Sequence, residues 1–276
     1  RDNPTAAWLA RQERPFRIVT LAPLDMFNEA LDFRLENCGG YLGLASQRYL
    51  DLIAAFEQRQ LNPTPLHFRQ PFGPRRDSRT LLELLNVRYL VAGEQAGLAA
   101  LGLQPVFRDG TATTYAVPSL PGRAWLVHDV RRLPDAAAVL HALTDSSFAA
   151  AATALVTGPD GPAPFRTRSA TSDTMTVAAA AGAVTVRYRS AAGAVLVVSE
   201  LWHGQWRVTV DGSPAAYFPV NHALLGCVAP AGAHEVVARF VEPIPPVTRL
   251  AFAGLLLALA AALYALARRV TSPGSR

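Results

Sequence analysis

The stretch AVTVRYRSAAGAVLVVSELWHGQWRVTVDG, residues 183–212, decides the fold. Between residues 184 and 189 apolar and polar side chains alternate, which is the period-two pattern of a strand with one buried face. Residues 194–198 are continuously apolar, as is typical of a central strand. Residues 206–210 alternate again, and Asp211-Gly212 then turns the chain. The stretch therefore predicts three consecutive strands of a β-rich domain.

The flanking sequence extends this pattern in both directions. Further strands are predicted at residues 124–128, 153–157, 174–178, 224–229 and 235–241, with one helix at about 135–143. Short strands separated by Gly and Pro turns are typical of a sandwich. Residues 119–242 are therefore predicted to form an antiparallel β-sandwich.

Residues 1–118 show a mixed pattern and are predicted to form a separate α/β subdomain. Helices are expected at 45–58, where apolar residues recur at helical spacing, and at 78–85 with Ser78 as N-cap. Strands are expected at 16–21 and 87–91, and a hairpin joins 106–108 to 113–117 across Asp109-Gly110. The fold class is thus α+β.

Residues 250–267 form an uncharged apolar run that ends at Arg268-Arg269. A helix needs about 20 apolar residues to cross a bilayer, so one transmembrane helix is predicted at about 247–267, after a Pro-rich spacer at 243–246. The basic pair places the tail in the cytoplasm and residues 1 to about 246 outside it. A buried helix of a soluble protein is the alternative, although the run has no polar stripe. Because the sequence starts at Arg1 without a signal-type segment, we expect an upstream part of the same protein to carry it across the membrane.

Charge and cysteine content limit the functional classes. The net charge of +5 comes from arginine alone and the arginines are scattered, so no nucleic-acid partner is expected. Cys38 and Cys227 are the two cysteines, and they are either two buried thiols or a disulfide.

No constellation of catalytic or metal-binding residues is present in the sequence. His203, His222 and His234 lack the tight spacing of a zinc motif, and Ser199-Glu200 has no nucleophile elbow around it. The glycines at 39, 40 and 43 are not followed by the Lys-Ser/Thr of a phosphate loop. We therefore expect no catalytic residue, no cofactor and no metal in this chain.

Several motifs follow one another in a characteristic order. They are Ser199-Glu200 with Trp202, Gly204 and Trp206; Val210-Asp211-Gly212-Ser213-Pro214; Asn221; and Pro230-Ala231-Gly232-Ala233-His234. Together with Gly39-Gly40-Tyr41 and Leu85-Asn86-Val87-Arg88-Tyr89, they resemble the C-terminal region of the YfhO family of bacterial membrane proteins. The resemblance covers most of residues 15–267. The chain departs from it at 201–203 and 225–227, where Leu-Trp-His and Leu-Gly-Cys stand in place of the usual residues.

The resemblance implies a function for the parent protein. YfhO-like proteins are similar to the GT-C glycosyltransferases, which transfer sugar from a polyprenyl-phosphate carrier to an acceptor of the cell envelope. Their catalytic acid lies in an early outer loop that this chain lacks, so the chain itself is expected to be non-catalytic. Expected partners are the bilayer, the upstream transmembrane domain and envelope glycan or polyprenyl-linked sugar. A singly anchored surface module that binds glycan or protein is the alternative.

Five residues are candidates for contact with a glycan or acceptor: Trp202, His203, Trp206, Tyr217 and Asn221. Aromatic rings can stack on the apolar faces of sugars. Trp206, however, shares a strand face with Val208 and Val210, which also fits a position in the core.

Overall fold

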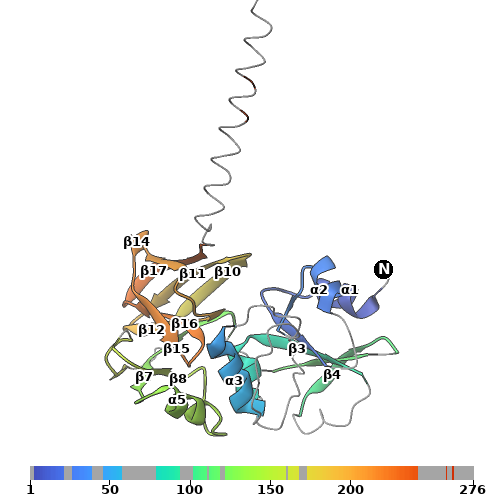
Figure 1. Ribbon diagram of the computed structural model, residues 1–276, viewed down its shortest axis with the longest axis horizontal. Coiled ribbons are helices and arrows are strands. Elements are labelled where there is room, and N and C mark those ends of the chain that lie inside the picture. The colour runs from blue at the N-terminus through green and yellow to red at the C-terminus, as the bar shows by residue number, and fades with distance from the viewer. Residues whose placement is uncertain are drawn as a thin grey trace, which may run out of the picture. The chain divides into compact units, whose positions relative to one another are not determined.

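The computed structural model describes residues 3–21, 27–38, 46–57, 79–93, 102–110, 112–118, 122–159, 161–167 and 173–241, together with Leu259 and Leu263. The chain divides into two units, Arg1–Arg239 and Phe240–Arg276. Nearly all described residues belong to the first unit, which contains helices and several sheets, most of whose strand pairs are antiparallel (Figure 1). This confirms the predicted mixture of helices with antiparallel sheets.

The first half of the unit, which comprises the elements up to residue 118, is built on a mixed five-stranded sheet. Its strands, in spatial order, are β2 (Glu36–Asn37), β1 (Arg17–Thr20), β3 (Val87–Ala92), β5 (Thr113–Ala116) and β4 (Gln104–Arg108). The pairs β2–β1 and β1–β3 are parallel, whereas β3–β5 and β5–β4 are antiparallel. The helices of this half are α1 (Pro4–Ala10), α2 (Phe27–Asp32), α3 (Gln47–Glu57) and α4 (Arg79–Leu84).

The second half contains three further sheets. One has the order β10 (Thr174–Ala180), β11 (Ala183–Ser190), β17 (Gly232–Phe240), β13 (Trp206–Val210) and β14 (Ser213–Pro214). Another has the order β15 (Tyr217–Val220), β16 (Leu224–Ala229), β12 (Ala194–Leu201) and β6 (Ala124–Val127). The third consists of β8 (Thr153–Val156), β7 (Asp129–Arg132) and β9 (Phe165–Arg166), and α5 (Ala136–Leu143) lies between β7 and β8 in the sequence.

Strand β12 lies at the centre of the second half, as its apolar run predicts. Its first six residues are all buried, so both faces of the strand are covered. Antiparallel partners lie on each side of it, β16 on one and β6 on the other.

One hydrophobic core joins the two halves of the unit. The same cluster contains Leu52 and Phe56 of α3, Val195 and Val197 of β12, and Leu155 of β8. Helix α3 also contacts α5 directly. A second, smaller core under α1 includes Leu9, Phe16, Ile18 and Tyr89. The two predicted subdomains therefore share apolar side chains along their junction.

The hairpin of β15 and β16 comes unusually close to its neighbouring side chains at Gly226. A Cβ atom at this position would lie 2.9 Å from Phe218 Cε2 and 3.0 Å from Val220 Cβ. Because both neighbours are buried, even a methyl group here would force the hairpin to shift.

The predicted membrane segment is not part of the described structure. Among the described residues, none of the helices has the length and apolar content needed to cross a bilayer. Residues 247–267 lie outside them except for Leu259 and Leu263, which are helical and exposed. The transmembrane helix stays a prediction, as does the N-cap role of Ser78, which also lies outside the described residues.

Candidate functional site

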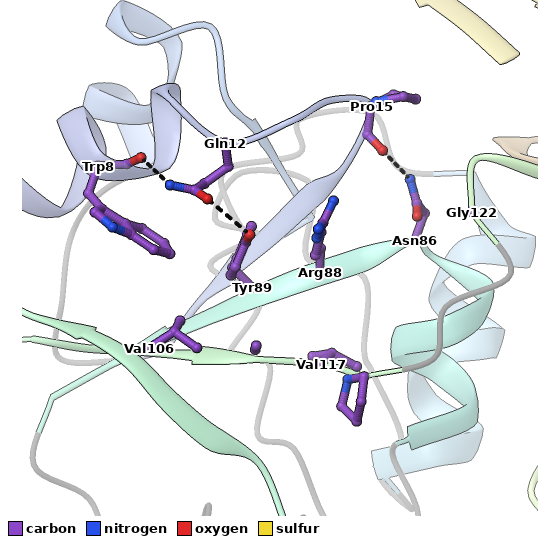
Figure 2. Close-up of a pocket in the computed structure, with 11 residues that line it drawn as sticks. Trp8, Gln12, Pro15, Asn86, Arg88, Tyr89, Val106, Val117 and Gly122 are labelled. Carbon is purple, nitrogen blue, oxygen red and sulfur yellow. Dashed lines mark hydrogen bonds between the residues drawn. The ribbon is translucent and has the colours of Figure 1, made fainter.

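A pocket of about 630 Å³ lies over the sheet of the first half, next to α1 (Figure 2). Its volume is within the range of about 300–1,000 Å³ that is usual for ligand sites. Residues from α1, β3, β4 and β5 and from the segments next to them line it: Trp8, Gln12, Pro15, Asn86, Arg88, Tyr89, Val106, Ala116, Val117, Pro118 and Gly122. Its walls combine aromatic rings with a few polar groups, which is the usual composition of a small-molecule site.

Helix α1 brings Trp8 and Gln12 to the pocket. Two features favour the start of this helix at Pro4. Proline is suited to the first turn, and Asn3 caps the helix because its Oδ1 accepts a hydrogen bond of 2.9 Å from Ala6 N. Trp8 and Gln12 are four residues apart and so share one side of the helix end. Gln12 Nε2 donates to Trp8 O at 3.0 Å, which orients the amide with its oxygen toward Tyr89 (Figure 2).

Aromatic contacts fix the orientation of the Trp8 ring. The ring stacks on Phe107 with a centroid distance of 5.2 Å and an interplanar angle of 15°. It also meets the edge of Tyr89 at 5.4 Å, and Tyr89 in turn meets Phe16 at 5.1 Å. These ring pairs stabilise one arrangement of the aromatic wall.

The polar groups of the pocket keep unused hydrogen-bonding capacity. Tyr89 OH lies 3.5 Å from Gln12 Oε1, which is too long for a strong hydrogen bond. Asn86 uses its amide nitrogen on Pro15 O at 3.2 Å and retains its oxygen. Arg88 donates to Glu13 O at 3.3 Å and is exposed. A ligand with several hydroxyl groups would find both donors and acceptors here.

The sequence did not predict this pocket. Asn86, Arg88 and Tyr89 were part of a quoted motif, but Trp8 and Gln12 lie in a helix that was not predicted. The pair Asn3-Pro4 was the available signal, because it combines a favoured N-cap with proline in the first turn.

The five residues predicted to contact a glycan do not form one surface. Trp202 is half-buried, and His203 is exposed. Trp206 is buried and donates from Nε1 to Leu201 O at 2.9 Å. Tyr217 OH donates to Gly204 O at 3.0 Å. Asn221 has no exposed surface, so a ligand does not reach it in this structure.

Trp202 takes part in a polar cluster with helix α3. The Arg48 guanidinium lies 5.2 Å from the centroid of the Trp202 ring and donates to His222 O at 2.9 Å. His222 Nε2 is 3.5 Å from Asp51 Oδ2, too far for a good hydrogen bond. Burial, with a smaller contribution from Arg48, lowers the pKa of His222, and Asp51 opposes the shift. This cluster attaches α3 to the loop before β16.

The Ser199-Glu200 motif forms the centre of a buried ion network. Arg17 Nη2 lies 3.0 Å from Glu200 Oε2, and Arg123 binds the other oxygen of the same carboxylate. Glu36 Oε2 contacts both guanidinium groups, at 3.2 and 2.7 Å. Burial by itself would lower the pKa of Arg17, but Glu200 and other negative groups outweigh it, and the pKa is raised. Two arginines thus share two carboxylates at the junction of the halves.

Ser199 has a structural contact instead of a nucleophilic role. Its hydroxyl donates to Leu84 O at 2.7 Å, and Arg17 Nη1 donates to the same hydroxyl at 3.0 Å. His203, which the sequence places nearby, is exposed. The Ser199 hydroxyl therefore links β12 to the end of α4.

A second polar chain consists of Asp173, His128 and Thr167. His128 Nε2 is 2.9 Å from Asp173 Oδ2, and its Nδ1 is 2.9 Å from Thr167 Oγ1. The Thr167 hydroxyl donates its proton to Gly193 O at 2.8 Å. Because that proton is committed to a carbonyl, the chain links the segments before β10 and β12 and does not activate a nucleophile.

Cys38 and Cys227 are both free thiols. Burial of the sulfur atoms raises the pKa of Cys38 to about 11 and that of Cys227 to about 12. Both are therefore protonated and unreactive at neutral pH. Within the described part of the chain, no group of three or more His, Cys, Asp or Glu residues is arranged to hold a metal ion.

Two of the quoted turn motifs meet in space. His234 Nδ1 donates to Asp211 Oδ2 at 2.6 Å, and its Nε2 lies 3.1 Å from Ala231 O. Asp211 Oδ1 accepts from Glu235 N at 2.8 Å. Gly232 has φ +124°, and a Cβ there would lie 2.9 Å from His234 Nε2, so only glycine leaves room for the ring.

This pair predicts a pH-dependent contact. Both ring nitrogens of His234 face acceptors, so the imidazolium satisfies two contacts and the neutral ring only one. Asp211 therefore raises the pKa of His234 above 6.5, while His234 lowers that of Asp211. The contribution of His234 to stability is complete below pH 6.5 and lost as the pH rises through its raised pKa.

We expect an NMR titration of the histidine ring protons to show this directly. Asp211→Asn keeps a side-chain acceptor for Glu235 N and tolerates the positive φ of this position, but removes the charge. The pKa of His234 should then return toward 6.5, while the lowered pKa of His222 stays as it was. An unchanged His234 pKa in this variant would contradict the assignment.

Comparison of the chain with protein families, with curated proteins and with solved structures finds no match. The pocket and the polar clusters are therefore interpreted from their geometry.

Proposed function

We propose that this chain is the extracytoplasmic C-terminal region of a multi-pass bacterial membrane protein that resembles YfhO and the GT-C glycosyltransferases, and that it binds envelope glycan without catalysing a reaction. The β-sandwich over residues 119–242 and the membrane helix at about 247–267 are part of this proposal. The chemistry would take place in the upstream membrane domain, and this region would hold the acceptor.

The pocket beside α1 is the observation that carries the proposal. It presents a fixed indole ring together with an amide oxygen, a phenol and a guanidinium. A sugar ring has apolar C–H faces and a rim of hydroxyl groups, so it can pack against the aromatic wall and bond to the polar groups at once.

The positions of the motif residues also support the proposal. Glu200 takes part in the ion network, the side chains of Asp211 and His234 form an ion pair, and Asn221 is buried. Each of these residues has a structural contact or a buried position within the first unit. The motifs therefore lie in one folded unit, which supports treating them as parts of one region.

Binding of a neutral disaccharide tests the glycan part of the proposal. Calorimetric titration of the full chain in mild detergent with cellobiose, maltose and N,N′-diacetylchitobiose should show saturable binding of at least one of them. Trp8→Ala should weaken that binding by about tenfold or more, since tryptophan anchors commonly contribute over 1 kcal/mol. Trp202→Ala is the matched control and should bind as the unchanged chain does.

Two outcomes would overturn this part of the proposal. One is the absence of binding to all three disaccharides at millimolar concentration. The other is a loss of binding in Trp202→Ala with none in Trp8→Ala, which would move the site to the residues first identified from the sequence.

The upstream coding sequence tests the membrane part. The proposal requires about eight or more further spans and an acidic residue in the first outer loop. A signal sequence directly before Arg1 with no other spans would overturn it and identify a singly anchored surface module instead.

A further inference from the structure

We infer that the pocket selects saccharides that carry an anionic group, a carboxylate or a phosphate, and that Arg88 is the residue that recognises this group. The inference rests on the proposed glycan binding and adds the class of sugar. It follows from the charge of the pocket and from the position of one guanidinium.

Arg88 is the one charged side chain among the described residues that line the pocket. The other polar lining side chains are the neutral groups of Trp8, Gln12, Asn86 and Tyr89. Glu13 contributes its backbone carbonyl to Arg88, not its carboxylate. An anionic ligand would thus meet a positive charge at this wall without a competing carboxylate from the lining.

The strand β3 presents Arg88 to the pocket. It is the single exposed residue of a strand whose other five residues are buried. The backbone below it is held by the neighbouring segment, since Val117 N donates to Arg88 O at 2.9 Å. In Figure 2 its guanidinium points up from the strand, between Gln12 and Asn86. The charged group therefore lies among the neutral groups that would bind sugar hydroxyls.

The guanidinium of Arg88 is oriented but largely unused. Its Cζ lies 5.7 Å from the centroid of the Tyr89 ring, and its Nη1 makes the long contact to Glu13 O. In the described part of the chain it has no carboxylate within ion-pair distance, whereas Arg17 and Arg123 each contact two. A guanidinium has five N–H donors in a planar fork that matches a carboxylate or phosphate. Arg88 therefore keeps the donors that such a group requires.

Monosaccharides with neutral or anionic groups at C6 test this inference. The full chain in mild detergent is titrated with methyl glucoside, methyl glucuronide and glucose 6-phosphate. We expect at least one anionic sugar to bind about tenfold more tightly than methyl glucoside, with the preference falling as salt is added. Which anionic sugar gains affinity distinguishes carboxylate from phosphate.

Arg88→Gln should abolish the preference, because the neutral and anionic sugars then meet the same uncharged wall. Arg88→Lys retains the charge but not the planar fork, so it should keep only part of the preference. Arg207→Gln is the control, because Arg207 is an exposed arginine on strand β13 outside the pocket. It should leave the preference intact.

The outcomes separate this inference from the proposed function. Equal affinity for all three sugars, lost in Trp8→Ala, would overturn the anion preference and leave glycan binding standing. A preference that survives Arg88→Gln would overturn the assignment to Arg88. No binding of any sugar would overturn both.

Discussion

Replacing Glu200 with glutamine is expected to lower the free energy of unfolding by about 3–5 kcal/mol, the usual cost of breaking a buried ion pair from one side. The substitution leaves Arg17 and Arg123 with one carboxylate, Glu36, which is far more exposed. The side chain of Arg123 is only 4% exposed, so its charge cannot recover hydration from solvent. Urea unfolding of the full chain in mild detergent, followed by tryptophan fluorescence, measures the loss.

The exposed pair of Arg187 and Glu235 supplies the control. Its atoms are 2.6 Å apart, but 72% of the Arg187 side chain and 40% of the Glu235 side chain are exposed. Glu235→Gln should therefore change the free energy of unfolding by at most about 0.5 kcal/mol. A loss below about 1 kcal/mol in Glu200→Gln, similar to that in Glu235→Gln, would show that the network does not hold the halves together.

Asn221→Ala is expected to have the second large effect. It should lower the free energy of unfolding by about 2–4 kcal/mol, because two costs add. Asn221 Oδ1 accepts from Leu155 N at 2.9 Å, and Asn221 N donates to Leu155 O at 2.8 Å. Alanine removes the acceptor and leaves a buried N–H without a partner. It also has to adopt the left-handed backbone of this residue, φ 48°, which asparagine tolerates better.

Asn221→Gly separates the two costs. Glycine also removes the acceptor, but it accepts the left-handed conformation without penalty. We expect Asn221→Gly to be more stable than Asn221→Ala by about 1 kcal/mol in the same urea experiment. Equal stability of the two variants would show that the backbone conformation contributes nothing. A negligible loss of stability in both would show that Asn221 does not stabilise the contact with β8.

Local patterns predicted the strands of this chain well. The alternation at 184–189 corresponds to β11, and the apolar run at 194–198 corresponds to β12. Asp109-Gly110 lies between β4 and β5, as predicted. These features depend on the period of side chains along one segment, which the sequence displays directly. The two-residue elements β2, β9 and β14 were missed because two residues do not establish a period, and β7 and β15 were missed as well.

The roles of the motif residues were harder to predict. Asp211 and His234 were each assigned to a turn, but their contact depends on how strand β17 pairs within its sheet. Glu200 was predicted only as part of a motif with Ser199, and its partners in the structure are Arg17 and Arg123. Such contacts join segments far apart in the sequence, and no local pattern encodes them.

The candidate pocket shows the same limit. It needs residues of α1, β3, β4 and β5 to come together, and α1 is far from these strands in the sequence. Asn86, Arg88 and Tyr89 lie in a quoted motif, but no local pattern joins them to Trp8 and Gln12.

The ion network can be completed only late in the synthesis of the chain. Arg17 and Glu200 are 183 residues apart, so the first arginine is synthesised long before its carboxylate exists. Strand β17, which closes the largest sheet of the second half, is made later still. Until Glu200 has been made, Glu36, the more exposed carboxylate of the network, is the acidic partner of Arg17 that is present. A nascent chain in this state exposes apolar surface and is a natural client for chaperones.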